Sequence, residues 1–352
     1  MTAPIRIAYV IDPRFPGGTS AAVAAELRVA SRFGALSVHA VESAMFHGRH
    51  VAPQLQAAFD DLAITPIWNA PVIAGDLVLL HNPAFLKFQP VFPARILCRQ
   101  LHVITHENFE RPGGHECFDV AGCLTQIERA TLALRKVIAP ISRVNRATVE
   151  SWLGARPGFG GWTVQPQDWF NICAFDLCPP TAAPADRRGR HSRPGAEKFP
   201  SLAALDLCFP AHAAANTLLG ADSLIAEGIS RPHWHLLPFG GLALDRYFEM
   251  VDFMVYFTAP TWRESFGRVL AEGMAAGKVV ISDRETAASF GAGVIAARPA
   301  DVDAIIARHV ADPGLYRRQV ASAQDALAQF SAARFAEMFA EVVAQAGPKA
   351  AA

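Results

Sequence analysis

Two glutamates, Glu264 and Glu272, flank a short segment that is typical of the start of a helix. Ser265, Phe266 and Gly267 follow the first glutamate, and the small residues among them leave backbone N–H groups open to a ligand. The first N–H groups of a helix attract anions such as phosphate. A neighbouring carboxylate can bind hydroxyl groups of a sugar or ribose. The segment therefore indicates a site for a nucleotide sugar.

A simpler interpretation of the same spacing is a salt-bridge ladder. Glu264, Arg268 and Glu272 are four residues apart, so on one helix they would share a solvated face and stabilise it by only tenths of a kcal/mol. Against this, the loop 258–263 places Glu264 before the helix rather than on it. The apolar run 252–257 predicts a strand that delivers the segment to the carboxyl edge of a sheet, where ligands bind in such folds. We therefore favour the binding site over the ladder.

The elements that must position this segment alternate between strand and helix in the first half of the chain. Apolar runs without polar alternation belong to strands buried on both faces, and repeated β-α units imply a parallel, doubly wound α/β sheet. Ser142 is suited to cap the helix that we expect at residues 142–153. The expected strands are 5–11, 36–41, 77–81, 101–106 and 137–141, and the expected helices are 19–33 and 142–153.

The pattern breaks between residues 154 and 194, where Gly, Pro and aromatic residues dominate. This composition is typical of a linker, so we expect a domain boundary there. Alternation then resumes with 202–209, which is compatible with helix or strand. The later expectations are strands at 233–238, 252–257 and 279–282, and helices at 302–310, 314–330 and 332–344. Residues 347–352 are expected to fray.

Composition narrows the class of protein. The 352 residues suffice for two domains, and 51% are apolar while 18% are charged. Lys+Arg and Asp+Glu both number 32, so no net positive charge favours binding to nucleic acid. The six cysteines are scattered without a Cys-x-x-Cys pair, which indicates reduced thiols. The first residues resemble a strand rather than a signal peptide, and these features predict a cytoplasmic protein.

The two-glutamate segment resembles the Glu-x7-Glu signature of retaining glycosyltransferases of family 4, which have the GT-B fold. That fold consists of two Rossmann-like doubly wound domains facing a central cleft. The family's usual Glu-Gly-Phe-Gly has Ser265 in place of its first Gly here. The resemblance implies that Glu264 contacts donor-sugar hydroxyls, that the amides of 265–267 contact sugar and phosphate, and that Glu272 holds the ribose.

A basic cluster offers a second part of the site. Four arginines fall within residues 187–193, and Lys198 follows. Such a cluster suits a diphosphate, although a solvated basic loop is the common alternative. The family resemblance implies that Arg190 and Lys198 contact the donor pyrophosphate. The spacing is longer than usual. The segment 182–188, which leads into the cluster, has the composition of a poor strand, which leaves Arg188 and Arg193 as alternatives to Arg190.

The first domain contributes fewer candidates. Gly17 and Gly18 end the loop after the first strand, where glycines permit close approach of a ligand or simply make a tight turn. The resemblance implies that this loop faces the donor phosphates and the acceptor. His106 ends a strand beside the expected cleft, and the resemblance implies a contact with the donor sugar. His81 is a weaker candidate of the same kind.

No metal site is expected. Asp301 and Asp303 have the Asp-x-Asp spacing of metal-dependent glycosyltransferases, but Asp301 is better explained as a helix N-cap. Elsewhere the sequence shows no convincing ligand spacing. The resemblance to GT-B enzymes does not call for a metal either.

These observations predict three segments: an acceptor-side domain at 1–165, a nucleotide-sugar-binding domain at 166–330, and a final helix at 331–352 that packs back on the first domain. The resemblance implies metal-independent, retaining transfer of a sugar from a nucleotide-diphosphate sugar to a saccharide or glycolipid, in cell-surface polysaccharide or glycoconjugate synthesis. UDP or GDP is the expected nucleotide, no other cofactor is expected, and membrane contact would follow only from a lipid-linked acceptor. A sugar-nucleotide epimerase and a non-catalytic sugar-binding protein remain alternatives.

Overall fold

The computed structural model describes residues 4–15 and 17–347, and its contacts separate two compact units. Unit 1 comprises Met1–Ala174 and Phe330–Ala352, and unit 2 comprises Phe175–Gln329. The observed limit after Ala174 lies within the Gly- and Pro-rich stretch 154–194, a little beyond the sequence-based limit at residue 165. The expected fraying after Gly347 concerns residues outside the described ones.

Unit 1 is built on a parallel sheet whose strand order is β3-β2-β1-β4-β5-β6-β7. The order reverses between β1 and β4, as in a Rossmann sheet, so the loops after these two strands diverge and leave room for a ligand. Residues 7–11 of β1 are buried throughout, because helices cover both faces. The strands are β1 (Arg6–Ile11), β2 (Ala35–Ala40), β3 (Ile67–Trp68), β4 (Val72–His81), β5 (Arg95–Thr105), β6 (Thr131–Pro140) and β7 (Trp162–Val164).

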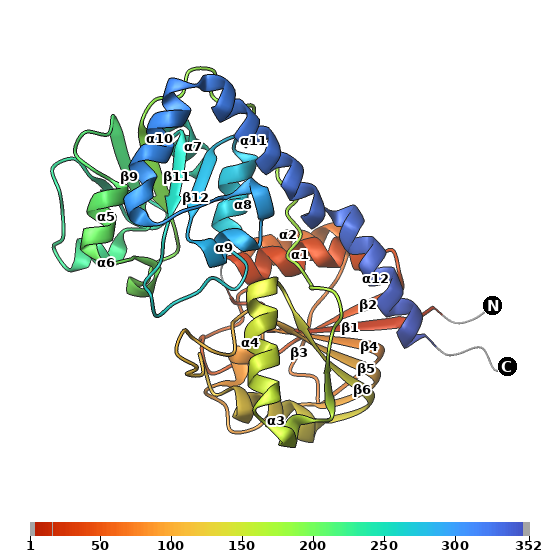
Figure 1. Ribbon diagram of the computed structural model, residues 1–352. Helices are drawn as coiled ribbons and strands as arrows, with labels where there is room; N and C mark the ends of the chain where they lie inside the picture. Colours follow the sequence, from red (N-terminus) through yellow and green to blue (C-terminus); the bar gives the residue numbers. More distant parts are fainter. Residues whose placement is uncertain (1–3, 16, 348–352) are drawn as a thin grey trace. The chain divides into compact units, whose positions relative to one another are not determined.

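The helices of unit 1 cover the sheet from two sides (Figure 1). The core beneath α3 and α4 includes Val10, Leu80 and Trp152, whereas α1 packs on the opposite face. Ser142 caps α4 as expected, by accepting a hydrogen bond from the Asn145 N–H. The helices are α1 (Gly18–Ala30), α2 (Pro53–Asp61), α3 (Val120–Ala130), α4 (Arg143–Gly154) and α12 (Ala332–Ala346), with 3-10 turns at Pro83–Leu86 and Pro157–Phe159.

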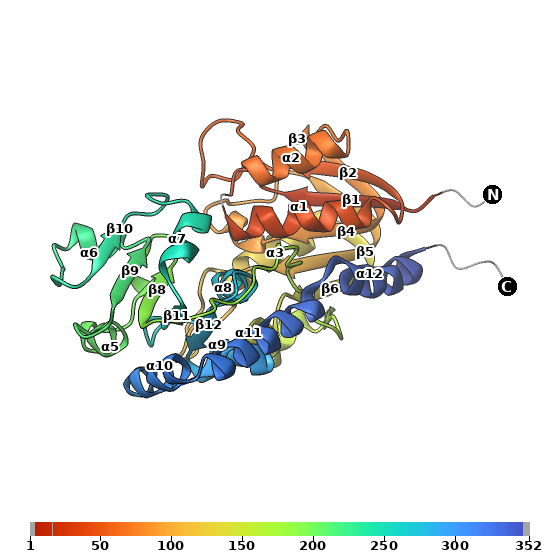
Figure 2. The ribbon, with the colours of Figure 1, turned by 90° about the horizontal axis from the view of Figure 1, so that it is seen from above.

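The last helix of the chain, α12, packs within unit 1 beside α1 (Figure 2). Its apolar stripe supplies Phe335 and Phe339. The ring of Phe339 lies 5.4 Å from that of Phe33, and the ring of Phe335 lies 5.5 Å from that of Trp169. Edge-on aromatic contacts of this kind stabilise the packing beyond the apolar area that they bury.

Unit 2 repeats the same sheet plan. Its parallel strands follow the order β10-β9-β8-β11-β12-β13, so the reversal now falls between β8 and β11. The strands are β8 (Arg187–His191), β9 (Ala215–Leu219), β10 (His235–Leu237), β11 (Phe253–Tyr256), β12 (Val279–Ser282) and β13 (Ile295–Ala296).

The helices of unit 2 bury a core that includes Phe209, Val255, Ile281 and Tyr316. They are α5 (Leu202–Cys208), α6 (Asp222–Ala226), α7 (Leu244–Met250), α8 (Arg268–Ala275), α9 (Arg284–Ala288), α10 (Val302–Ala311) and α11 (Pro313–Leu327), with 3-10 turns at Ala196–Lys198, Gly291–Gly293, Pro299–Asp301 and Ala328–Phe330. Most of the helices are short, whereas α10 and α11 have 10 and 15 residues.

The prediction of two parallel, doubly wound α/β units is confirmed. Two local expectations are corrected. The basic residues 187–191 form strand β8 rather than linker, because Arg188 and Arg190 find partners inside the unit. The ambiguous segment 202–209 contains helix α5, which the Ser201 side chain caps.

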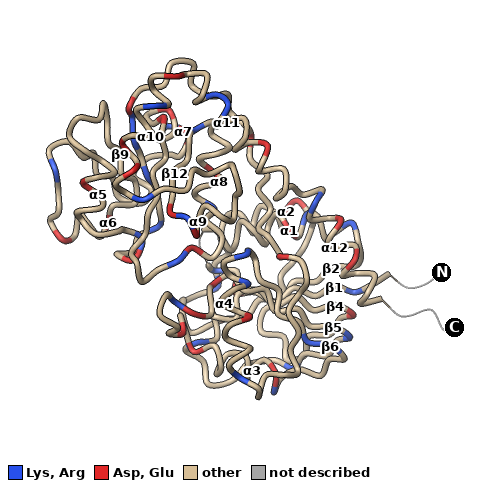
Figure 3. The backbone as a smooth tube through the Cα atoms, in the orientation of Figure 1, with Lys and Arg blue, Asp and Glu red and all other residues tan. Residues whose placement is uncertain are grey.

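Charged residues of both signs are dispersed over each unit (Figure 3), in keeping with the balance of 32 basic and 32 acidic residues. Within residues 4–15 and 17–347, no helix combines the length and apolar character that a membrane span requires.

Candidate functional site

The loops that follow β8 and β11 in unit 2 start at the point where the strand order reverses. Ligands of open α/β sheets bind outside the carboxyl ends of the strands at such a point. The loop after β8 carries Lys198, and the loop after β11 carries Glu264. β8 and β11 are parallel neighbours, so both loops emerge at the same edge of the sheet.

Lys198 and Glu264 form a buried ion pair at this edge. The Lys198 Nζ lies 2.6 Å from the Glu264 Oε1, and the two side chains are 6% and 14% exposed. The hydroxyl of Tyr256, the last residue of β11, donates to the same oxygen at 2.7 Å. Both donors use Oε1, and no described residue donates to Oε2. The second oxygen of Glu264 is therefore available to accept hydrogen bonds from a ligand.

These contacts set the protonation of the cluster. Burial on its own would raise the pKa of Glu264, but the charge of Lys198 and the hydrogen bonds from Lys198 and Tyr256 together hold the pKa below its ordinary value. Burial raises the pKa of Tyr256 well above its usual range, and the Glu264 carboxylate adds to that rise. Glu264 is thus a carboxylate at neutral pH and Tyr256 a neutral donor.

The structure separates Glu264 from the salt-bridge ladder. Helix α8 begins at Arg268, so Glu264 lies in the preceding loop and pairs with Lys198. The remaining ladder pair does form, because Arg268 Nε lies 3.0 Å from Glu272 Oε1. The ladder interpretation therefore describes Arg268 and Glu272 but not Glu264.

The N-terminus of α8 has the features of an anion site. Gly267 occupies the N-cap position with a φ of 87°, a left-handed conformation that favours glycine, and as a glycine it makes no side-chain capping hydrogen bond. The ring of Phe266 is 5% exposed and lies 5.8 Å from that of Phe290, so this side chain anchors the loop. Ser265 precedes it in the same loop. Backbone N–H groups, rather than side chains, would meet an anion here.

Glu272 lies on α8 and faces His191 at the end of β8. Its Oε2 is 3.6 Å from the His191 Nε2, beyond hydrogen-bond distance. Burial, followed by the charge of Arg190, lowers the pKa of His191 to about 4, so this ring is neutral at pH 7. Burial raises the pKa of Glu272 despite the ion pair with Arg268.

The arginines of the basic cluster differ in their partners. Arg188 is 1% exposed and donates to the carboxylates of Asp186 and Asp303, at 2.6 Å each. Arg190 is also 1% exposed and donates to the backbone carbonyls of Lys198 at 2.5 Å and of Phe257 at 3.3 Å. Arg188 therefore stabilises unit 2 by joining Asp186 to Asp303, and Arg190 holds the backbone at Lys198 in place.

Arg193 is the arginine whose head group faces solvent. Its side chain is 58% exposed and has a weak partner in Glu197, at 3.4 Å. Its guanidinium lies 5.8 Å from the ring centre of Trp262, and the Lys198 ammonium lies 4.8 Å from the same centre. Two cations thus flank one aromatic side chain next to Glu264.

The remaining predicted residues belong to unit 1 and lie at the carboxyl ends of its strands. Gly17 has a φ of 88° and is the N-cap of α1, and Gly18 begins that helix. His106 directly follows β5, is half-buried, and lies with its Nε2 3.1 Å from the Nδ1 of His81, the last residue of β4. Gly17 thus follows β1 and His81 ends β4, the two strands between which the order of this sheet reverses.

Two aspartates at the start of α10, Asp301 and Asp303, already have hydrogen-bond partners for their carboxylates. Asp301 stands at the N-cap position of α10, but its carboxylate accepts from Arg298 rather than from the helix. Asp303 approaches Asp186 and His212, a set that could hold a metal by distance alone. The Arg188 guanidinium already donates to both of these carboxylates. A fixed cation in that place removes the reason to infer a metal.

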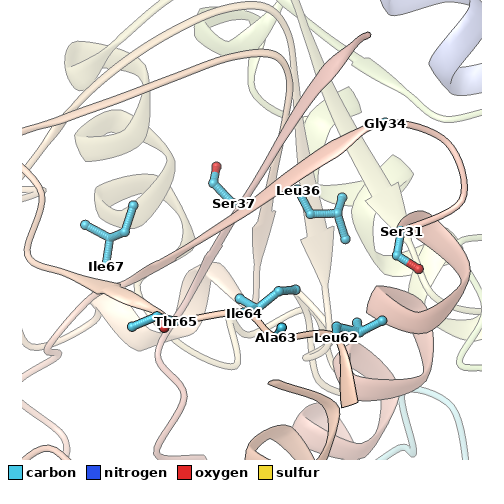
Figure 4. Close-up of a pocket in the computed structure, with 9 residues that line it drawn as sticks. All are labelled: Ser31, Gly34, Leu36, Ser37, Leu62, Ala63, Ile64, Thr65 and Ile67. Carbon is cyan, nitrogen blue, oxygen red and sulfur yellow. The ribbon is translucent and has the colours of Figure 1, made fainter. Parts of the chain in front are cut away.

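A surface depression in unit 1 is a weaker candidate for a functional site than the loops of unit 2. Figure 4 shows its lining, in which Leu36, Ile64 and Ile67 stand beside the hydroxyl groups of Ser31, Ser37 and Thr65. The lining contains no charged side chain. It lies beside β2 and β3, away from the point where the strand order of unit 1 reverses.

The sequence analysis missed Tyr256 as part of the site. Its position at the end of an apolar strand was compatible with a core residue, and only the fold brings its hydroxyl to Glu264. A tyrosine at the carboxyl end of a strand that leads into a candidate loop is the signal that could have identified it.

Comparisons with known proteins bear on the fold. No family model and no curated protein matches the chain. A sucrose-phosphate synthase from Thermosynechococcus elongatus is similar in structure, with a TM-score of 0.58 and 16% identity over 97% of this chain and 98% of that one. A trehalose-6-phosphate synthase studied with bisubstrate glycomimetics reaches 0.58 with 11% identity, over 98% of this chain and 100% of that one.

An alpha-glucosyltransferase in complex with UDP and a 13-mer DNA has a TM-score of 0.56 and 11% identity, over 97% of this chain and 100% of that one. At these identities the likeness establishes the fold. The chain therefore has the GT-B fold with two parallel α/β units, as the family resemblance predicted.

Proposed function

We propose that the chain is a retaining, metal-independent glycosyltransferase that moves a sugar from a nucleotide-diphosphate sugar to a saccharide or glycolipid acceptor. One observation carries this proposal. The buried Lys198–Glu264 pair lies where the strand order of unit 2 reverses, shortly before a helix whose N-cap residue, Gly267, makes no side-chain capping hydrogen bond. A carboxylate for sugar hydroxyls and an anion site for phosphate are thereby combined in one loop.

Glu264 would orient the donor sugar. Its Oε1 is held by Lys198 and Tyr256, which fixes the carboxylate in place, and its Oε2 is left to accept from hydroxyl groups. A carboxylate that is ionised and held before substrate arrives loses little entropy on binding.

Arg193 and Lys198 would neutralise the diphosphate, together with the amides of 265–267. We choose Arg193 over Arg190 because the guanidinium of Arg190 is buried and bonded to backbone carbonyls, whereas that of Arg193 is exposed. Arg190 then acts indirectly by supporting the Lys198 backbone. Positive charge and helix N–H groups would stabilise the nucleoside diphosphate as it leaves.

Glu272 would accept from the ribose hydroxyls. Its Oε2 makes no hydrogen bond with His191 at 3.6 Å, and a hydroxyl donor would satisfy it. UDP or GDP is the proposed nucleotide, and UDP is supported by two similar alpha-glucosyltransferase structures, which contain UDP and UDP-glucose.

Retention, the acceptor and the cellular role rest on the family resemblance. One similar structure concerns glycosyl transfer with retention by trehalose-6-phosphate synthase. We propose a role in cell-surface polysaccharide or glycoconjugate synthesis in the cytoplasm, with membrane contact if the acceptor is lipid-linked.

The proposal is tested first by thermal shift with UDP-, GDP-, ADP- and dTDP-sugars. The matching donor should raise the melting temperature, because a ligand that binds only the folded state stabilises it. Stabilisation by none of them would overturn the proposal.

The second test uses the Glu264→Gln variant, which keeps the size of the side chain. Transfer should fall by about 100-fold while stabilisation by the nucleoside diphosphate persists. Glu249→Gln, at an exposed carboxylate on α7, is the matched control and should leave transfer unchanged. Release of free sugar or an epimer without any acceptor would instead identify an epimerase.

A further inference from the structure

Three neighbouring strands of unit 1, β4, β5 and β6, extend beyond the start of β1. β1 pairs with β4 from Leu77 onward, so residues 72–76 of β4 continue past it. The register places Ala74, Leu97 and Leu132 side by side across the three strands (Figure 1). These residues lie near the start of each strand, at the opposite edge of the sheet from the candidate residues of unit 1.

One face of this extension is covered and the other is exposed. Ile73 and Ile96 are buried in the core of unit 1. Successive side chains of a strand point to opposite faces, and Leu97 is 44% exposed. Leu132, its neighbour on β6, is 74% exposed, and Leu134 is 82% exposed. Apolar side chains grouped on a surface in this way mark a site of contact with another molecule.

The outer edge of β6 lacks a strand partner over the same stretch. β6 has ten residues, but β7 pairs only with Lys136, Val137 and Ile138. Residues 131–135 therefore have β5 on one side and no described strand on the other. A strand with a single neighbour directs alternate N–H and C=O groups away from it. This stretch is therefore a template to which another strand can pair.

Arginines without a carboxylate partner flank the exposed leucines. Arg129 is exposed in the last turn of α3, shortly before β6, and Arg135 directly follows Leu134. Arg99 lies on β5, the neighbouring strand. Arg135 donates to the uncharged side chain of Gln345 at 3.0 Å. The described carboxylates nearby are paired with other basic residues, namely Asp76 with Arg6 and Glu128 with Lys136.

The charge and the free strand edge together select the kind of partner. Two copies paired through this edge about a two-fold axis would run antiparallel, which brings Arg129 of one copy toward Arg135 of the other. Like charges opposed across an interface disfavour that pairing. A lipid surface suits leucines and arginines, but it offers no groups arranged to pair with the N–H and C=O groups of a strand. An extended peptide with acidic residues satisfies all three features.

We propose that residues 131–135 of β6 bind an extended, acidic peptide segment of another protein, which adds to the sheet as a further strand. The backbone of the peptide pairs with β6, and its apolar side chains cover Leu132 and Leu134. Its acidic residues contact Arg129 and Arg135. This contact is independent of sugar transfer, because the segment lies at the edge of the sheet opposite the candidate residues of unit 1.

Hydrogen exchange of the full chain, followed by mass spectrometry, tests the edge. In the free protein, residues 131–135 should exchange faster than residues 136–138, which pair with β7. The probe is a synthetic peptide with valine, threonine and valine at its centre and two acidic residues at each end. At about ten times its Kd it should slow exchange at 131–135 by about tenfold. The same peptide methylated at its three central nitrogens cannot donate to β6 and should not slow exchange.

Charge reversal tests the choice of an acidic partner. Arg129→Glu combined with Arg135→Glu should weaken binding of the acidic peptide by about tenfold or more. The same double variant should gain affinity for a peptide with lysines in place of the acidic residues. Arg143→Glu, at an exposed arginine that begins α4, is the matched control and should leave both affinities unchanged. Leu132→Thr with Leu134→Thr keeps strand-forming side chains but should weaken the acidic peptide by about tenfold, because it removes the apolar contact.

Slow exchange at 131–135 in the free monomer would overturn the proposal, because the edge would then already be covered. So would an acidic peptide that slows nothing at millimolar concentration, or one that the lysine or methylated version equals. Sedimentation with phosphatidylserine vesicles, without peptide binding, would assign the surface to a membrane instead. A dimer in analytical ultracentrifugation that the double threonine variant converts to a monomer would assign it to a second copy of the chain.

Discussion

Lys198 and Glu264 are joined by a 2.6 Å ion pair although 66 residues separate them in the chain. The pair connects the loops after β8 and β11, the two strands between which the order of the unit 2 sheet reverses. It therefore couples the stability of this edge to the charge of the group that we expect to hold the donor sugar. Changes to either partner should affect folding and activity together.

Replacing Lys198 with Met should destabilise the protein by about 3 kcal/mol at pH 7, because it leaves the Glu264 carboxylate buried without its counter-charge. Urea denaturation followed by circular dichroism measures this loss. Arg246→Met, which removes an exposed ion pair with Glu249, is the control and should cost less than about 0.5 kcal/mol. Equal losses in the two variants would contradict a special role for the buried pair.

The stability of the chain should fall at acid pH in part through Glu264. Its folded-state pKa lies below its ordinary value, so its contribution is fully present above the unfolded pKa of about 4.5 and is lost as pH falls through the folded pKa. The free energy of unfolding, measured from about pH 7 down to about pH 3, should therefore fall less with decreasing pH in Glu264→Gln than in the unaltered chain. An unchanged dependence would show that the carboxylate gains nothing from its partners.

Arg193 and Arg190 should separate into a binding and a structural residue. Arg193→Gln is expected to raise the KM for the donor by about tenfold with little effect on unfolding, because the exposed guanidinium has only weak partners. Arg190→Gln should cost about 2 kcal/mol of stability, because it leaves the carbonyls of Lys198 and Phe257 buried without a donor.

Donor titrations and urea curves on both variants make this comparison. Loss of donor binding in Arg190→Gln with unaltered stability, together with a neutral Arg193→Gln, would reverse the assignment. That outcome would restore the arginine that the sequence spacing favoured.

The sequence was sufficient to predict the two parallel units because apolar runs and β-α alternation reflect burial that is nearly local. The four-residue spacing alone could not decide between the ladder and the site at Glu264, because that spacing is the same in a loop and in a helix. The loop 258–263, which places Glu264 before the helix, favoured the site. Nothing in the sequence indicated that Glu264 would meet Lys198 and Tyr256, since that contact depends on which strands are neighbours.

The arginine cluster is a second case in which the sequence alone did not reveal which residues contact one another. Its charge density was compatible with a diphosphate site or with a solvated loop, yet Arg188 and Arg190 lie on a strand and are 1% exposed. Buried arginines are uncommon unless paired, and their partners, Asp186, Asp303 and two backbone carbonyls, are assembled only by the fold. A charge run by itself does not reveal which of its members remain open to a ligand.

Gly267 provides a test of the anion site that leaves every charge in place. Its φ of 87° costs a residue with a side chain about 1–2 kcal/mol, and an added Cβ would lie 3.2 Å from the Phe290 Cε2. Gly267→Ala should therefore destabilise the protein by roughly that amount and weaken donor binding, because the turn that presents the amides of 265–267 must distort.

Gly158→Ala is the matched control, because a Cβ there meets nothing within 4 Å and the residue lies in unit 1. It should leave both stability and donor binding unchanged.

Donor affinity is best compared under conditions where both variants are fully folded, so that a global loss of stability does not imitate a local loss of donor binding. Weaker binding of the nucleotide sugar with unchanged binding of the free nucleoside would place the defect at the phosphates, since the helix N-terminus would act there. Full donor affinity in Gly267→Ala would show that the amides of this turn do not bind the diphosphate.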